Sequence, residues 1–132
     1  MKSLFLSFVG ATSLLAAVSA ESHHSFAAEF DVNRPVKLTG TVTKLEWTNP
    51  HAWVFIDAKD DSGKVQSWAV ELVGINDLLR RGWGRDRVKQ GDTINVDGFG
   101  AKNGTNTANA ASVTLANTGE LLWASVPRTE GN

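Results

Sequence analysis

The chain has 132 residues, with 13 lysines and arginines against 14 aspartates and glutamates, and it contains no cysteine. The near-neutral charge excludes a global attraction to nucleic acid or to anionic membrane surfaces. The lack of cysteine excludes disulfides and thiolate metal sites, so the fold must rest on its apolar core. The length is that of one domain.

The first twenty residues have the pattern of a secretory signal peptide. Lys2 gives a positive start, residues 4–18 are apolar or small, and Val18-Ser19-Ala20 fits the small-residue rule for cleavage. The apolar run is about fifteen residues, whereas roughly twenty are needed to span a bilayer. We therefore expect residues 1–20 to be removed, leaving an exported chain, periplasmic or secreted, with no transmembrane segment.

The mature chain is expected to begin with an extended arm and a long bent strand. Residues 21–35 show little periodicity and are interpreted as the arm, which Phe26 and Phe30 can pin against the body. From Val36 the apolar positions alternate with a period of two, as in a half-buried strand. The phase reverses before Leu45, which predicts a β-bulge near residues 43–45.

A hairpin and a short helix are expected next. Residues 52–59 and 65–72 alternate on either side of the polar turn Asp60-Asp61-Ser62-Gly63, which predicts two paired strands. Residues 74–82 predict a helix with Asn76 as its N-cap and Gly82 as its left-handed stop, after which Trp83 folds back.

Two more strands complete the pattern. Ile94 and Val96 mark the fourth strand and residues 111–115 the fifth, with a small polar loop over residues 100–109 between them. Gly98, Gly100 and Gly104 lack phosphate-loop spacing and are interpreted as loop formers. Residues 121–123 can extend the sheet, and residues 127–132 are expected to form a frayed tail.

Three strands, a helix and two strands, with the first strand long and bent, is the order of an OB-type barrel. We therefore expect a mainly β protein: a small five-stranded OB-like Greek-key barrel with one short helix between strands 3 and 4. Residues 36–126 would form this single domain. Another small open β-barrel or a β-sandwich is the alternative.

The segment from Trp47 to Trp53 is the candidate functional site. Asn49-Pro50 is turn chemistry, so His51 should lie at a sheet rim between two indoles. A rim histidine can equally be satisfied by a backbone carbonyl, and the tryptophans can equally be core residues. The candidate ligand-binding residues are aromatic or polar side chains of this rim together with the basic end of the helix: Trp47, Asn49, His51, Trp53, Phe55, Arg80 and Arg81.

Three motifs in one order carry a resemblance to a known family. They are His23-His24-Ser25-Phe26, Trp47-x-Asn49-Pro50-His51-x-Trp53 and Leu78-Leu79-Arg80-Arg81-Gly82-Trp83. On these motifs the chain resembles a family of small exported bacterial proteins known only as a domain of unknown function. The resemblance implies no activity, cofactor or catalytic residue.

The mature N-terminus is a candidate metal site. Cleavage after Ala20 gives a free amine on Glu21, then Ser22, then His23. The terminal amine, two amides and the imidazole can wrap Cu(II) or Ni(II) in a plane of four nitrogens, the geometry that these ions favour. His24 and His51 are further candidate ligands. Coincidence of composition remains the other interpretation of this spacing.

These observations favour an exported, non-catalytic binding protein of unknown ligand, with copper as the one cofactor that the sequence suggests. A structural or interaction module of the cell envelope, bound to an envelope protein, is the alternative. An enzyme using His51 is third, because no nucleophile context and no second catalytic group accompany that residue. Nucleic acid is not expected as a partner, and no catalytic residue is assigned.

Overall fold

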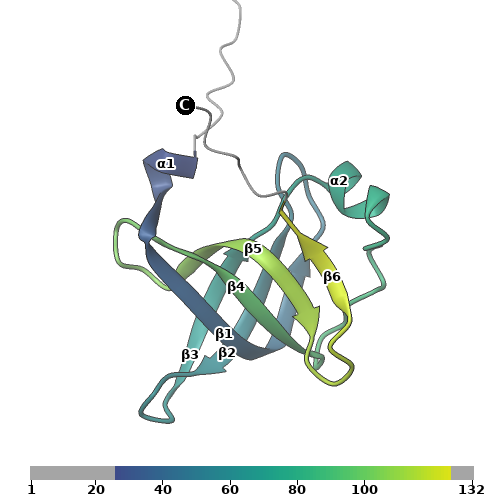
Figure 1. Ribbon diagram of the computed structural model, residues 1–132. Helices are drawn as coiled ribbons and strands as arrows, with labels where there is room; N and C mark the ends of the chain where they lie inside the picture. Colours follow the sequence, from purple (N-terminus) through teal and green to yellow (C-terminus); the bar gives the residue numbers. More distant parts are fainter. Residues whose placement is uncertain (1–25, 126–132) are drawn as a thin grey trace, which may run out of the picture.

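The computed structural model describes residues 26–125, which form one six-stranded sheet and two short helices (Figure 1). The elements in chain order are α1 (Phe26–Glu29), β1 (Phe30–Glu46), β2 (Trp53–Lys59), β3 (Val65–Glu71), α2 (Ile75–Arg80), β4 (Thr93–Ala101), β5 (Thr107–Leu115) and β6 (Leu121–Ala124).

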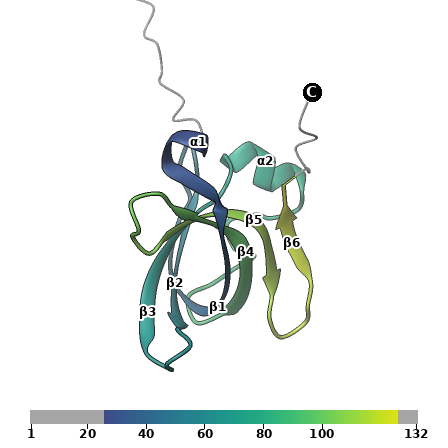
Figure 2. The ribbon, with the colours of Figure 1, turned by 60° about the vertical axis from the view of Figure 1, so that its left-hand side comes forward.

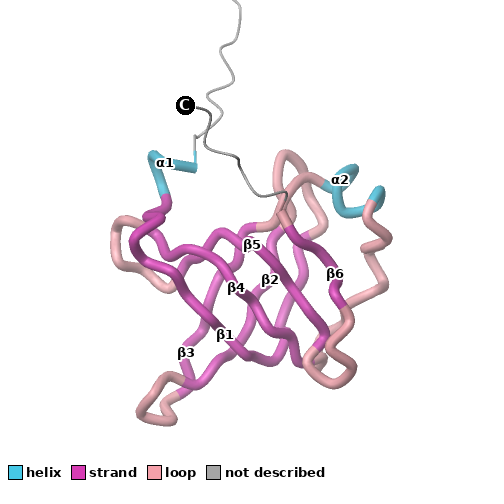
Figure 3. The backbone as a smooth tube through the Cα atoms, in the orientation of Figure 1, coloured by secondary structure: helices cyan, strands magenta, loops and turns pink. Residues whose placement is uncertain are grey.

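The sheet closes on itself. Its strands are neighbours in the order β3-β2-β1-β4-β5-β6, and a parallel pairing joins β3 to β5 (Figure 3). The first five strands therefore make a closed barrel, to which β6 adds along β5. The mainly β, OB-like barrel predicted from the sequence is confirmed, with α2 between β3 and β4. The expected extension over residues 121–123 is the sixth strand.

β1 is long because it pairs with β4 along its first part and with β2 along its last part. Its register against β2 shifts between Val42 and Lys44, which confirms the predicted bulge. Near the change of partner, a Cβ on Gly40 would lie 2.8 Å from the carbonyl oxygen of Asp57. The two strands approach too closely there for any side chain, so glycine is required.

The barrel interior is filled by side chains that alternate along the strands. On β2, Val54, Ile56 and Ala58 are buried, whereas the residues between them are more exposed and lie on the outer face. The largest fully buried side chains come from the strands and from the α2 region: Trp83, Ile56, Leu72, Leu78, Ile94, Val42, Val54, Val70, Val96 and Val113.

The loop between the fourth and fifth strands is shorter than predicted. β4 continues to Ala101 and β5 begins at Thr107, so only residues 102–106 connect them. The prediction that Gly98 and Gly100 form loops was wrong, because both lie in β4 and are buried. Glycine in a strand weakens the alternating apolar pattern from which strands are predicted.

Gly98 and Gly100 each lie so close to a neighbouring group that a side chain would crowd it. A Cβ on Gly98 would lie 2.2 Å from the carbonyl oxygen of Asn109, beside a register shift between β4 and β5. A Cβ on Gly100 would lie 3.0 Å from the Arg34 side chain, whose Nη1 donates to the carbonyl of Ala101 at 2.7 Å. The missing side chains therefore let backbone and guanidinium pack closely.

The N-terminal end of the described chain belongs to the fold. The prediction of an extended arm up to residue 35 differs from the structure, since α1 is helical and β1 begins at Phe30 (Figure 2). Phe30 is buried, and Phe26 stacks on it with ring centroids 5.7 Å apart. The two aromatic rings, spaced four residues apart, help to hold this segment against the barrel, together with the pairing of Phe30 with Ala101.

α2 ends as predicted but begins differently. Gly74 is its N-cap and makes no side-chain cap bond, so the assignment of Asn76 as N-cap was wrong. At the other end, Gly82 has φ +85°, and the amide of Trp83 donates to the carbonyl of Leu78 at 2.9 Å. This is the Schellman pattern, in which a left-handed glycine turns the chain back over the last helical turn.

The β2–β3 hairpin turns where the sequence predicted. Asp60 Oδ1 accepts hydrogen bonds from the Ser62 amide, the Ser62 hydroxyl and the Lys64 amide, at 2.9, 2.6 and 3.0 Å. The pKa of the Asp60 carboxyl is lowered below its ordinary value, chiefly by the Ser62 side chain and then by that of Gln66. Hydrogen bonds to the ionised carboxylate stabilise its charged form.

Candidate functional site

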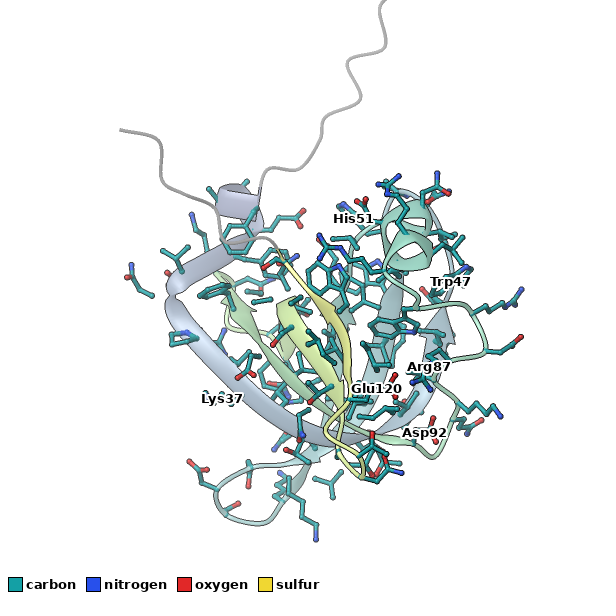
Figure 4. The ribbon with its side chains drawn as sticks, turned by 45° about the vertical axis from the view of Figure 1, so that its right-hand side comes forward. Lys37, Trp47, His51, Arg87, Asp92 and Glu120 are labelled. Atoms are coloured by element: carbon teal, nitrogen blue, oxygen red, sulfur yellow. The ribbon has the colours of Figure 1, made fainter. Side chains whose placement is uncertain are left out.

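The rim loop, residues 47–52, connects β1 to β2 at the end of the barrel where α2 also lies (Figure 4). The predicted bend is confirmed: Thr48 Oγ1 donates to the carbonyl of His51 at 3.1 Å, and the Asn49–Pro50 peptide bond is cis. Trp47 is partly buried and packs against the core. His51 precedes β2 rather than opening it, and its side chain is 45% exposed.

His51 faces a buried carboxylate. Its Nδ1 lies 3.3 Å from Oε1 of Glu71, at the end of β3, and Glu71 is only 8% exposed. The same oxygen accepts a hydrogen bond of 3.2 Å from Nδ2 of Asn109 on β5. A buried carboxylate is costly unless polar partners surround it, so these contacts are a specific arrangement of the rim.

The pair of His51 and Glu71 has a defined chemistry. A carboxylate that faces one ring nitrogen of a histidine fixes the orientation of the ring and raises its strength as a ligand. Nδ1 is directed toward Glu71, so Nε2 is the atom that His51 can present to a metal or a polar ligand. Of the acids in the described chain, Glu71 is the one that the structure places against the His51 ring.

Strand register explains why these residues meet. Trp53 is directly opposite Glu71 across the β2–β3 pair, Glu71 matches Asn109 across the β3–β5 pair, and Asn109 is opposite Phe99 across the β4–β5 pair. One row of outward side chains therefore crosses four strands. Phe26 meets Phe99 edge-on, with ring centroids 5.6 Å apart.

Sequence reasoning missed Asn109, Phe99 and Phe26 as members of this neighbourhood. Asn109 had been placed in a loop, which concealed its register with Glu71. The usable signal was the predicted fold itself, since closure of an OB-type barrel pairs β3 with β5. That pairing sets β3 beside β5, and the observed register places Glu71 opposite Asn109.

Trp53 and Phe55 lie on the outer face of β2 and are partly buried. Phe55 is opposite Lys44 on β1 and opposite Ala69 on β3. The Nζ of Lys44 stands 5.4 Å from the centroid of the Phe55 ring. The two aromatic residues are therefore surface-side residues of the barrel wall, two positions apart on one strand.

The two arginines predicted to bind ligand have partners within the fold. Arg80 forms an ion pair with Asp77 one turn earlier on α2. Arg81 donates from Nη1 to the carbonyl of Ala124 at 2.8 Å, which ties the helix end to β6. Both guanidinium groups are therefore engaged by groups of the fold itself.

Four of the predicted metal-binding residues, Glu21, Ser22, His23 and His24, lie outside the described residues. Within residues 26–125, no group of three or more histidine, aspartate or glutamate side chains is arranged to hold a metal ion. His51 is the predicted ligand that the structure describes.

A cavity of about 610 Å³ opens between the loop before β4 and the β5–β6 turn. Arg87 and Glu120 form an ion pair from its two sides, and the carboxylate of Asp92 accepts a 2.8 Å hydrogen bond from the Lys89 amide (Figure 4). Arg87 is thus the basic residue of this loop whose charge is paired across the cavity.

These features define an OB-type β-barrel with a histidine–carboxylate pair at one rim. The model of the family described as "Family of unknown function (DUF6152)" matches residues 12–110, so the chain belongs to that family and the resemblance drawn from its motifs is confirmed. No curated protein matches the sequence. None of the helices described here is long and apolar enough to cross a membrane.

Two solved structures are similar to this chain at low sequence identity. The mitochondrial single-stranded DNA-binding protein Rim1 of S. cerevisiae is 11% identical, with a TM-score of 0.48 over 62% of this chain and 93% of that chain. The N-terminal domain of PriB from Thermoanaerobacter tencongensis is 15% identical, with a TM-score of 0.45 over 64% of this chain and 97% of that chain.

Proposed function

We propose that this protein is an exported, non-catalytic binding protein that holds a divalent transition-metal ion, Cu(II) or Ni(II), between its mature N-terminus and the barrel rim. The observation that carries the proposal is the contact of His51 with the buried Glu71. A metal-binding histidine usually has a carboxylate or carbonyl hydrogen-bonded to the ring nitrogen that does not bind the metal. Asn109 bonds the same carboxylate oxygen and so holds it in place.

The distance from the described N-terminal end to the rim supports this arrangement. Phe26 contacts Phe99, which is in register with Asn109, and Asn109 is bonded to Glu71. Two strand spacings separate Phe99 from Glu71, roughly 10 Å. The path from Phe26 to Glu71 adds the 5.6 Å between the Phe26 and Phe99 rings to these spacings. The five residues from Glu21 to Phe26, at about 3.4 Å each when extended, would span roughly 17 Å and so suffice for the terminal chelate to reach the rim.

The ligands would come from two parts of the chain. The amine of Glu21, the amides of Ser22 and His23 and the His23 imidazole supply a square plane of nitrogens. The barrel adds His51 through Nε2, with His24 as a further candidate. The expected export follows from the predicted signal peptide, which also generates the free amine on which the chelate depends.

Titration of the mature protein with Cu(II), followed by visible absorption and electron paramagnetic resonance, tests the proposal. Adding one residue before Glu21, or substituting His23→Ala, should abolish the tetragonal spectrum. His51→Ala should weaken binding and change the spectrum while leaving a chelate. Binding should release protons and weaken as pH falls, because the nitrogen ligands must be deprotonated.

Lys37→Ala serves as the control, because Lys37 is exposed and its nearest acid is Asp97, on the β1–β4 part of the wall. It should bind Cu(II) as the wild-type protein does. If the double variant His23→Ala, His51→Ala retains wild-type affinity, neither part of the proposed site binds the metal and the proposal fails.

A further inference from the structure

The outer face of β2, β3 and β5 carries a second feature beside the proposed metal site. Going along β2 from the rim, its outward residues are Trp53, Phe55 and Asp57, each starting a row across the neighbouring strands. The row from Phe55 continues to Ala69 on β3 and then to Thr107 on β5. We refer to these three rows as the β2–β3 face.

Side-chain size differs between the rows. Beside Phe55 lie the short side chains Ala69 and Thr107, both partly exposed. The row that starts at Asp57 is polar, and in it the hydroxyl of Ser67 donates to Asp57 Oδ1 at 2.7 Å. Aromatic rings are thus bordered by small residues and by a carboxylate–hydroxyl pair.

The charges of the β2–β3 face argue against a polyanion. Lys44, the cation over the Phe55 ring, is paired with Glu46 at 2.6 Å. Asp57 then gives the accessible part of the face a negative charge. Binding of single-stranded nucleic acid draws its affinity from cations that neutralise phosphates, and this face does not supply them.

The same groups suit a neutral polyhydroxylated ligand. Aromatic rings offer flat apolar surface for the C–H face of a sugar ring, while a carboxylate accepts from its hydroxyl groups. We infer that the β2–β3 face binds a neutral saccharide, with Trp53 and Phe55 as the stacking residues and Asp57 as the hydrogen-bond acceptor. This site borders the proposed metal site through the Trp53–Glu71 pair, but its three named residues are different ones and the inference stands without the metal.

Tryptophan fluorescence and isothermal titration calorimetry of the mature protein test the inference. The saccharide probes are maltotetraose, cellotetraose and N-acetylchitotetraose, and an oligo-dT is the nucleic-acid probe. At least one tetrasaccharide should bind saturably. Phe55→Ala should weaken that binding about tenfold, the loss expected for a single stacking ring. Ala69→Leu should block it by filling the middle row without disturbing the core.

Leu121→Ala is the matched control, because Leu121 is an exposed apolar residue on β6. It should bind the saccharide as the wild-type protein does. Absence of binding by all three tetrasaccharides at millimolar concentration would overturn the inference. So would binding that survives both Phe55→Ala and Ala69→Leu, or oligo-dT binding that Phe55→Ala abolishes. Cu(II) titration of the same variants should be unchanged, which separates this site from the metal site.

Discussion

The backbone amide of Trp83 is hydrogen-bonded to the carbonyl of Leu78, and both side chains are completely buried. The pair attaches α2 to the barrel core. Trp83→Ala should therefore lower the free energy of unfolding by about 3–5 kcal/mol, the usual cost of deleting a large core side chain. Urea denaturation followed by circular dichroism measures the change.

Trp53→Ala provides the comparison for this prediction. Trp53 is on the outer face and only partly buried, so its loss should cost clearly less. Equal and large losses at both positions would show that Trp53 is a core residue and would remove it from the proposed saccharide face.

Gly98→Ala should destabilise the barrel by about 1–3 kcal/mol, the range for overpacking. The added Cβ would lie 2.2 Å from the carbonyl oxygen of Asn109, so β4 and β5 must separate. Gly84→Ala is the control, since a Cβ there meets no atom within 4 Å. Thermal unfolding should separate the two variants; similar midpoints would contradict the close approach of the strands.

The segment before Val36 should contribute to stability. Phe30 is 3% exposed and stacks on Phe26, so Phe30→Ala should cost about 3–5 kcal/mol in unfolding experiments. Val32 is 61% exposed, and Val32→Ala should change stability by less than about 0.5 kcal/mol. A small effect at Phe30 would restore the interpretation of this segment as a loosely held arm.

Glu71→Gln should weaken Cu(II) binding by roughly tenfold or more, the usual effect of removing a carboxylate that supports a metal-binding histidine. The substitution keeps the size of the side chain and removes its charge. Glu46→Gln is matched to it, because Glu46 is also an acid on the outer face and its carboxylate pairs with Lys44. Competition with a chelator of known affinity gives the Cu(II) dissociation constants of both variants. An equal loss of Cu(II) affinity in the two variants would exclude a specific role for Glu71.

Asp60 should make the β2–β3 turn sensitive to acid. Its folded pKa is lowered by hydrogen bonds from Ser62 and Gln66. The stabilisation is therefore present above the unfolded pKa, about 3.9, and is lost as pH falls through the folded value. Carbon-detected NMR titration should give a pKa below that of a model peptide, and Ser62→Ala should raise it. An unchanged pKa in that variant would show that Ser62 is not the cause.

Much of the barrel was predictable because its strands alternate. The bulge after Val42, the hairpin at Asp60 and the helix stop at Gly82 each left a local signal in the sequence. The long β4 and β5 did not, since Gly98 and Gly100 were chosen by close approaches between strands distant in sequence. The local sequence pattern indicates which face of the sheet a residue lies on. Glycines such as these depend instead on the backbone or side chain that packs against them, which the local pattern does not indicate.

The candidate site was predictable only in part from the sequence. The turn at Asn49-Pro50 placed His51 at a rim from local chemistry alone. Its contact with Glu71 required the pairing of β2 with β3, and the bond from Asn109 required closure of the barrel. Strand topology therefore decides which residues form the site. Of these residues, only His51 is indicated by a local sequence motif.

The β3–β5 pairing, the seam that closes the barrel, is short. Three registered pairs join β3 to β5, from Ala69 with Thr107 to Glu71 with Asn109, whereas eight pairs join β1 to β4. Sub-global opening begins where the fewest contacts must be broken, so the seam is the natural place for this fold to open and close. Such an opening would part Asn109 from Glu71 and His51. Amide hydrogen exchange along β3 and β5 would then measure how often the rim is assembled, and a ligand bound there would slow that exchange.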